Sequence, residues 1–154
     1  MWGVVGALLL SVFLAKKVLS QPASPRSQGL PLLLDLGWSG VVYDVADALV
    51  LSVIPVLATW AAFSHLGWTA SWPGKIAVGA IALLTSLLVT TLYHFGFAEY
   101  QGAQMKAPLV GNGIMSLGYL LSANPLTALI SHAVMHMTAV LHGAATTVQL
   151  PPHY

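Results

Sequence analysis

The residues of this sequence with the clearest chemical potential are two histidines, His132 and His136, which lie four positions apart in an apolar segment. On a helix this spacing places both imidazole rings on one face, within reach of a single metal ion. The chain has no cysteine, so any metal must be held by histidine, carboxylate or amide groups. We expect a divalent metal, with zinc as the first choice, bound by His132, His136 and a third ligand from another helix, His94.

Two other uses of the same histidines remain open. An intramembrane histidine can ligate haem or chlorin, which would make the chain a pigment-binding or haem-binding subunit. The pair can also form hydrogen bonds to Ser, Thr or Asn side chains of neighbouring helices, with no ligand at all.

The acidic residues supply candidate bases for a reaction. Asp44 and Asp47 are three positions apart, so they share one helical face. We interpret Asp44 as a group that bonds a neighbouring helix or lies near lipid headgroups. The expected catalytic set is His94, Glu99 and Asp47, in which Glu99 or Asp47 is the general base for an attacking water. A solvated loop residue is the alternative interpretation of Glu99.

The composition indicates which kind of element must position these groups. Of the 154 residues, 57% are hydrophobic and only 6% are charged, whereas soluble domains contain about 25% charged residues. The mean hydropathy is +0.82. The lipid bilayer is therefore the expected partner, together with other membrane subunits. The net charge of +1 and the lack of a Lys and Arg cluster exclude a nucleic-acid partner.

The apolar segments predict an all-α fold, a polytopic transmembrane helical bundle of about five spans. Pro, Gly, Ser and Asn clusters separate these segments. The expected spans are residues 1–15, 40–63, 76–97, 108–123 and 125–143. The corresponding domain division is an N-terminal span at 1–20, a Pro/Ser linker at 21–37, a four-span bundle at 38–146 and a tail at 147–154.

The basic residues predict the orientation in a cell membrane. Lys and Arg in short loops remain cytoplasmic. Lys16, Lys17, Arg26 and Lys106 fall on one side of the predicted spans, and only Lys75 falls on the other. The amino terminus is therefore expected outside the cell and the carboxyl terminus inside, with the polar residues concentrated in the cytoplasmic half.

Residues 113–141 (GIMSLGYLLSANPLTALISHAVMHMTAVL) resemble the last two helices of the CAAX-protease and bacteriocin-processing family of intramembrane proteases. His132 matches the histidine of the family's His-x-x-x-Asn motif, and His136 stands where the asparagine is usual. Residues 86–94 resemble the family's other histidine-bearing helix, with Thr90 in the place of a phenylalanine four residues before His94. The resemblance implies a membrane-embedded hydrolase with a histidine-lined cavity.

One element of that family is absent. The Glu-Glu-x-x-x-Arg motif of an earlier helix does not occur, and residues 98–102 contain one glutamate and no arginine. The hydrolase, or a degenerate relative of it, is therefore one hypothesis. A non-catalytic accessory subunit of a larger membrane complex is the second. A small transporter component, with Asp47 as its ion site, is the third.

Overall fold

The computed structural model describes residues 2–23 and 25–143, apart from the side chain of Glu99. All regular structure in this part of the chain is helical, which confirms the expected all-α fold. The α-helices are α1 (Trp2–Leu19), α2 (Leu30–Gly37), α3 (Tyr43–Ala48), α4 (Ile54–His65), α5 (Trp72–Phe95), α6 (Lys106–Ser122) and α7 (Leu126–His142). Short 3-10 helices lie in the connections at Trp68–Ala70, Ala98–Tyr100 and Gly102–Met105.

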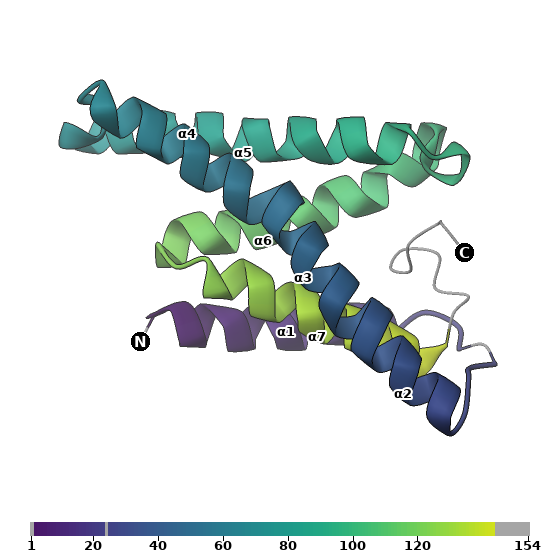
Figure 1. Ribbon diagram of the computed structural model, residues 1–154. Coiled ribbons are helices and arrows are strands. Elements are labelled where there is room, and N and C mark those ends of the chain that lie inside the picture. The colour runs from purple at the N-terminus through teal and green to yellow at the C-terminus, as the bar shows by residue number, and fades with distance from the viewer. Residues whose placement is uncertain (1, 24, 144–154) are drawn as a thin grey trace.

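Helices α2, α3 and α4 are parts of one continuous helix of 36 residues, Leu30–His65. Two π-helical segments, η1 (Trp38–Val42) and η2 (Leu49–Val53), join them. With α1, α5, α6 and α7, this helix forms a bundle whose members run back and forth between two ends (Figure 1). Three of the helices are long and apolar enough to cross a membrane: Trp2–Leu19, Leu30–His65 and Trp72–Phe95.

The linker is shorter than expected, because the second helix begins at Leu30, inside the segment 21–37 that we assigned to the linker. Gly29 has a positive φ of 62°, a conformation that glycine adopts without strain and that ends the linker. A proline in the first helical turn then starts the helix, since its missing N–H would have no partner there. The expected tail, 147–154, lies outside the described residues.

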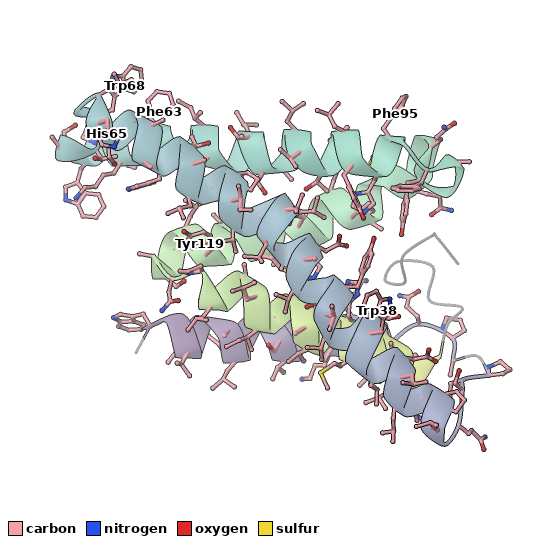
Figure 2. The ribbon with its side chains drawn as sticks, viewed as in Figure 1. Trp38, Phe63, His65, Trp68, Phe95 and Tyr119 are labelled. Atoms are coloured by element: carbon pink, nitrogen blue, oxygen red, sulfur yellow. The ribbon has the colours of Figure 1, made fainter. Side chains whose placement is uncertain are left out.

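The other helix boundaries also follow local signals. Ser71 caps α5 with its hydroxyl oxygen, which accepts a 3.2 Å hydrogen bond from the Gly74 amide. Ala123 ends α6 in the left-handed conformation, and Asn124 and Pro125 lead into α7. Aromatic residues lie on the outside near the two ends of the bundle, with Phe63 and Trp68 at one end and Phe95 at the other (Figure 2). The Phe63 and Trp68 rings meet edge to face at 5.0 Å.

Three helices bury a stripe of residues with a period of four, and many of these residues are small or polar. The stripe on the long helix is Gly40, Asp44, Ala48, Ser52 and Val56; on α5 it is Val78, Ala82, Ser86, Thr90 and His94; on α7 it includes Ala128, His132, His136 and Val140. Small residues at four-residue spacing let helix backbones approach closely, as in helix pairs within membranes. The bundle is therefore organised by these stripes and not by a large aliphatic core.

A buried group of polar side chains joins three of the helices at the centre of the bundle. Pro55 has no N–H, so the Leu51 carbonyl lacks its usual donor one turn ahead. This carbonyl instead accepts hydrogen bonds from Ser86 Oγ at 2.6 Å and from Asn112 Nδ2 at 3.2 Å. We call the residues around it the central polar cluster: Ser52, Ser86, Thr90, Asn112 and Ser116.

The members of the central polar cluster satisfy one another. Asn112 donates to Thr90 Oγ1 at 2.6 Å and to Ser86 Oγ at 2.9 Å, and its amide oxygen accepts from Ser52. All five side chains are buried. Because an unpaired polar group in hydrocarbon is costly, this cluster fixes the register of the long helix, α5 and α6 relative to one another.

We predict that Asn112→Leu destabilises the bundle, because it leaves the Ser52 hydroxyl and the Leu51 carbonyl with fewer partners. The expected loss is about 1–3 kcal/mol, the usual cost of an unsatisfied buried polar group. Unfolding of the purified protein by sodium dodecyl sulfate, followed by circular dichroism, measures it. Thr91→Val is the matched control, since the Thr91 hydroxyl bonds only the Leu87 carbonyl of its own helix. Equal stability of the two variants would contradict the prediction.

Candidate metal centre

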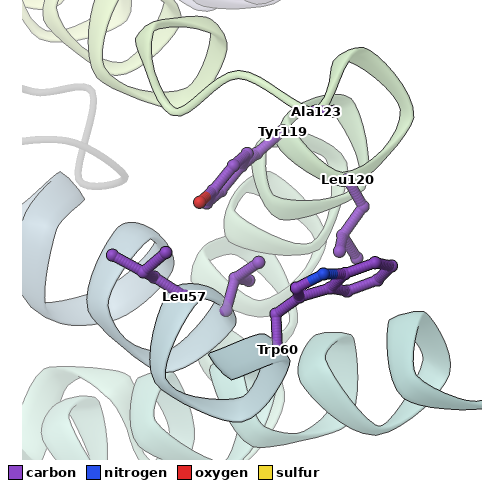
Figure 3. A pocket seen from close by; sticks show the side chains of 6 residues that line it. Leu57, Trp60, Tyr119, Leu120 and Ala123 are labelled. Carbon is purple, nitrogen blue, oxygen red and sulfur yellow. The ribbon is translucent and has the colours of Figure 1, made fainter. Parts of the chain in front are cut away.

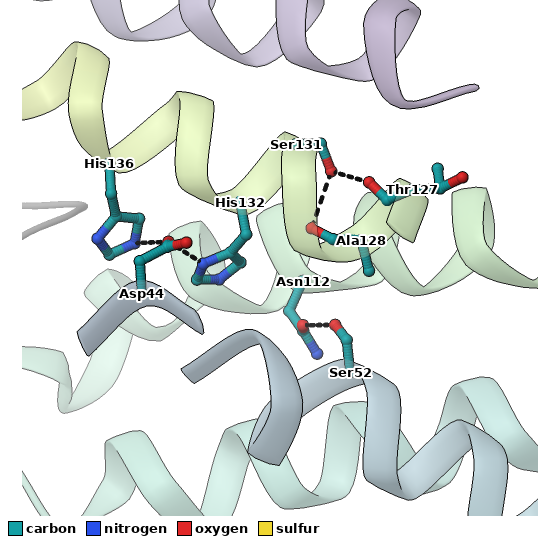
Figure 4. Close-up of polar contacts among 8 residues, drawn as sticks. All are labelled: Asp44, Ser52, Asn112, Thr127, Ala128, Ser131, His132 and His136. Atoms are coloured by element: carbon teal, nitrogen blue, oxygen red, sulfur yellow. Dashed lines mark hydrogen bonds and ion pairs between the residues drawn. The ribbon is translucent and has the colours of Figure 1, made fainter. Parts of the chain in front are cut away.

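Three ionisable side chains from two helices converge at one point inside the bundle. Asp44 projects from α3, and His132 and His136 project from successive turns of α7 (Figure 4). The Asp44 Oδ1 atom lies 2.5 Å from His132 Nδ1 and 3.6 Å from His136 Nε2. The two imidazole rings stack, with centroids 4.8 Å apart and planes inclined by 20°. Each residue offers one ligand atom, and these three atoms lie within 4.8 Å of one another.

The three side chains are enclosed. Asp44 has no solvent-accessible surface, and His132 and His136 are 4% and 6% exposed. Two of their polar atoms, Asp44 Oδ2 and His136 Nδ1, are buried without a hydrogen-bond partner among the described residues. Buried polar atoms are nearly always paired, so Asp44 Oδ2 is available to a cation beside the two histidines. His136 Nδ1 points away from the centre, because it is the Nε2 atom of this ring that faces Asp44.

The π-helical segments explain why Asp44 faces α7. Helix α3 contains only Tyr43–Ala48 and lies between η1 and η2. A residue four positions further along an ideal α-helix is rotated by about 40°, so a buried stripe of period four would wind around the helix. A π turn holds more residues than an α turn and offsets this rotation. The Asp44 and Ser52 side chains therefore both remain on the buried face.

His94, which we expected as the third ligand, lies elsewhere. It is buried, but its Nδ1 atom pairs with the Thr90 carbonyl oxygen at 2.9 Å. Its ring meets the Tyr100 ring edge to face at 4.7 Å and the Tyr93 ring at 5.1 Å. The position next to the histidine pair belongs to Asp44, because α3 packs directly against α7 whereas α5 packs against α4 and α6.

Asp47 lies beside the centre and not within it. Its side chain is half-buried, interacts with the Tyr93 hydroxyl and is close enough to His132 for an electrostatic interaction. The Tyr93 and Tyr43 hydroxyl oxygens are 2.5 Å apart. Among the described residues, Asp47 is thus a second carboxylate close enough to interact electrostatically with both His132 and Asp44. Glu99 belongs to the 3-10 helix Ala98–Tyr100, and its side chain lies outside the described residues.

The donor set fits a divalent metal. Two imidazoles and a carboxylate are the protein ligands of many catalytic zinc sites and of non-haem iron sites. In a tetrahedral zinc site, neighbouring ligand atoms are about 3.3 Å apart, given metal–ligand bonds of about 2.0 Å. The separation between Asp44 and His136 is near this value, whereas the 2.5 Å contact with His132 is a hydrogen bond. Metal binding therefore requires this contact to open, or the carboxylate to bind through Oδ2.

Sequence reasoning placed the histidine pair correctly on one helical face but gave Asp44 only a helix-bonding or headgroup role. A signal for Asp44 was present in the sequence. It stands four residues after Gly40 and four before Ala48, in a run of small residues that marks a close helix contact. A carboxylate in such a run must face a neighbouring helix.

We predict strong energetic coupling between Asp44 and His132. Replacing either residue leaves the other buried without its partner, so Asp44→Asn and His132→Gln should each destabilise the metal-free protein. The free energy of unfolding of the double variant should fall by much less than the sum of the two single losses. The expected coupling is about 1–3 kcal/mol, typical of a buried hydrogen bond that involves a charged group. Sodium dodecyl sulfate unfolding of the four proteins gives this energy. Thr138→Ala, on α7 but bonded only to the Val134 carbonyl, should show additivity with Asp44→Asn.

Comparison of the chain with protein family models, with curated protein sequences and with solved structures finds no match. The resemblance to intramembrane proteases therefore stays an expectation from the sequence. The function is inferred from the geometry of the chain's own side chains.

Proposed function

We propose that this chain is a multi-pass membrane protein that binds one divalent metal ion through Asp44, His132 and His136 and uses a metal-bound water for hydrolysis. The observation that carries the proposal is the enclosed cluster itself, with its three converging donor groups and the unpaired Asp44 Oδ2 atom. A centre with three protein ligands keeps a coordination position for water, which is the arrangement of catalytic zinc sites.

The membrane assignment is supported by the helices. Three are long and apolar enough to cross a bilayer, and α7 is apolar but shorter. The bundle places the α1–α2 and α5–α6 connections at one end and the α4–α5 and α6–α7 connections at the other (Figure 1). Lys16, Lys17, Arg26 and Lys106 belong to the first end and Lys75 to the second, so we assign the first end to the cytoplasm.

The local environment supports a hydrolytic use of the metal. A carboxylate beside a metal-bound water can act as general base, and Asp47 is placed beside His132 for this role. The resemblance to intramembrane proteases points to the same class of reaction. Ligation of a haem or chlorin through these nitrogens fits the cluster less well, because a macrocycle needs wide space in front of the ligating imidazole nitrogen, whereas His132 Nδ1 and His136 Nε2 both face the Asp44 carboxylate.

We predict that the protein, purified without chelators, contains one divalent metal ion per chain by elemental mass spectrometry. The variants Asp44→Ala, His132→Ala and His136→Ala should each reduce bound metal by roughly tenfold or more, since each removes a direct ligand. An absorption spectrum between 400 and 700 nm, recorded on the same sample, tests the alternative of a pigment or haem subunit.

Two histidine variants serve as controls for this measurement. His142→Ala removes another histidine of α7, whose Nε2 atom pairs with the Gln21 carbonyl oxygen at 2.7 Å, and should leave the metal content unchanged. His94→Ala should also retain metal, because Asp44 occupies the third position. Wild-type protein without metal, or loss of metal in His94→Ala together with its retention in Asp44→Ala, would refute the proposed ligand set.

We also predict the topology of the loops. Because the chain has no cysteine, single cysteines can report exposure without background labelling. In intact cells, Ala70→Cys in the α4–α5 connection should react with a membrane-impermeant maleimide, whereas Gln101→Cys in the α5–α6 connection should react only after the cells are opened. The reverse pattern would invert the proposed orientation, and labelling of both in intact cells would contradict a crossing by α5.

A further inference from the structure

A cavity of about 230 Å³ lies between α4 and α6, away from the metal centre. Its lining residues are Val56, Leu57, Trp60, Tyr119, Leu120 and Ala123 (Figure 3). Val56 is twelve residues after Asp44 on the same long helix, which corresponds to about 18 Å along the helix axis. The cavity and the metal centre are therefore separate sites in different halves of the bundle.

The cavity exists because α4 leaves the rest of the bundle after Pro55. Helix α4 packs against α5, whereas α6 packs against α5, α7 and α1. Figure 1 shows α4 diverging from the α6–α7 turn as it approaches the end of the bundle. The long helix is held to α6 at Ser52 by the central polar cluster, and beyond this point the two helices separate. The result is a wedge with its closed side toward the centre of the bundle.

The walls of this wedge define the chemistry of an occupant. None of the lining residues is charged, and Val56 and Tyr119, which form the inner wall, belong to the buried hydrophobic core. Leu57 is 55% exposed and stands at the outer surface, and Leu121, which follows the lining residue Leu120, is also exposed. An occupant must therefore be apolar and must reach the cavity from the apolar outer face of the helices.

The size of the cavity limits the occupant to a slender group. A volume of 230 Å³ holds about seven or eight groups the size of a water molecule or a methylene, at roughly 30 Å³ each. This is enough for the terminal half of a fatty acyl chain and too little for the four fused rings of a sterol. At this depth in a bilayer, hydrocarbon chains are the solvent of the protein, so such a chain is at hand.

We propose that this cavity binds the end of one acyl chain of a membrane phospholipid. The bound lipid fills the wedge between α4 and α6 and packs against the indole of Trp60 and the phenol ring of Tyr119. Transfer of a chain from the bilayer to the cavity gains little hydrophobic free energy, because both surroundings are apolar. The binding free energy therefore comes from the many van der Waals contacts of the methylene groups with the cavity walls. This site is independent of the metal ligands, so its test and that of the metal centre can fail separately.

The proposal is tested on the full chain, reconstituted with phosphatidylcholine and then passed through gel filtration in detergent. Native mass spectrometry should find one phospholipid retained per wild-type chain. Leu57→Trp and Leu120→Trp place an indole in the cavity, and retained phospholipid should fall about tenfold in each, since an excluded chain loses its methylene contacts. Leu88→Trp, on the exposed face of α5, is the matched control and should retain lipid as wild type does.

A second measurement identifies the position of the chain. Protein is loaded with phosphatidylcholine whose acyl chains are brominated and is then freed of unbound lipid. Its tryptophan emission should be weaker than that of protein loaded with unbrominated lipid, and most of this difference should disappear in Trp60→Phe. Wild-type protein that retains helical structure but no lipid would overturn the proposal. Equal retention in Leu57→Trp, Leu120→Trp and Leu88→Trp, equal quenching with and without Trp60, or a sterol or isoprenoid found in place of the phospholipid would also overturn it.

Discussion

The Asp44 carboxyl group has no solvent-accessible surface, and the structure around it depends on how that group is satisfied. A buried carboxylate without partners is too costly to persist in a folded protein, least of all inside a membrane. Its 2.5 Å contact with His132 and its approach to His136 bind α3 to α7. This attachment fixes the long helix at one point near its middle. The other fixed point is the central polar cluster, which holds the same helix to α5 and α6 through Ser52 and the Leu51 carbonyl.

These two attachments give the long helix its form. The helix must present Asp44 and Ser52 on the same side. In a regular α-helix, residues at this spacing would point in different directions. The π-helical segment η2, which begins between these two residues and includes Ser52, supplies the correction, and Pro55 frees the carbonyl that the central polar cluster uses. Beyond Pro55 no comparable polar group holds α4 to α6, and there the helices separate and leave the cavity. The candidate metal centre, the central polar cluster and the cavity thus all follow from the positions of the polar groups on the long helix.

The sequence was sufficient to predict an all-α fold of five helices but not the start of the second helix at Leu30 or the partner of the histidine pair. Apolar runs bounded by Pro, Gly and Asn marked five helices, and the four-residue spacing of His132 and His136 placed both rings on one face. The spacing says nothing about which helix lies opposite, because that depends on packing between segments far apart in the chain. His94 was expected there from its depth alone, yet depth does not determine lateral position in a bundle. The period-four stripe through Gly40, Asp44 and Ala48 carried that information.

The same contact that stabilises the bundle also limits what the centre can bind. In the structure, Asp44 Oδ1 and His132 Nδ1 share a hydrogen bond, and a proton lies between the two atoms that a metal ion would join. A metal ion must therefore displace a proton, as at other sites with histidine and carboxylate ligands. The oxygen that remains for such an ion is Asp44 Oδ2, which has no partner among the described residues. The two clusters therefore differ in the described structure: the centre keeps one carboxylate oxygen unpaired, whereas the side chains around Asn112 are paired with one another.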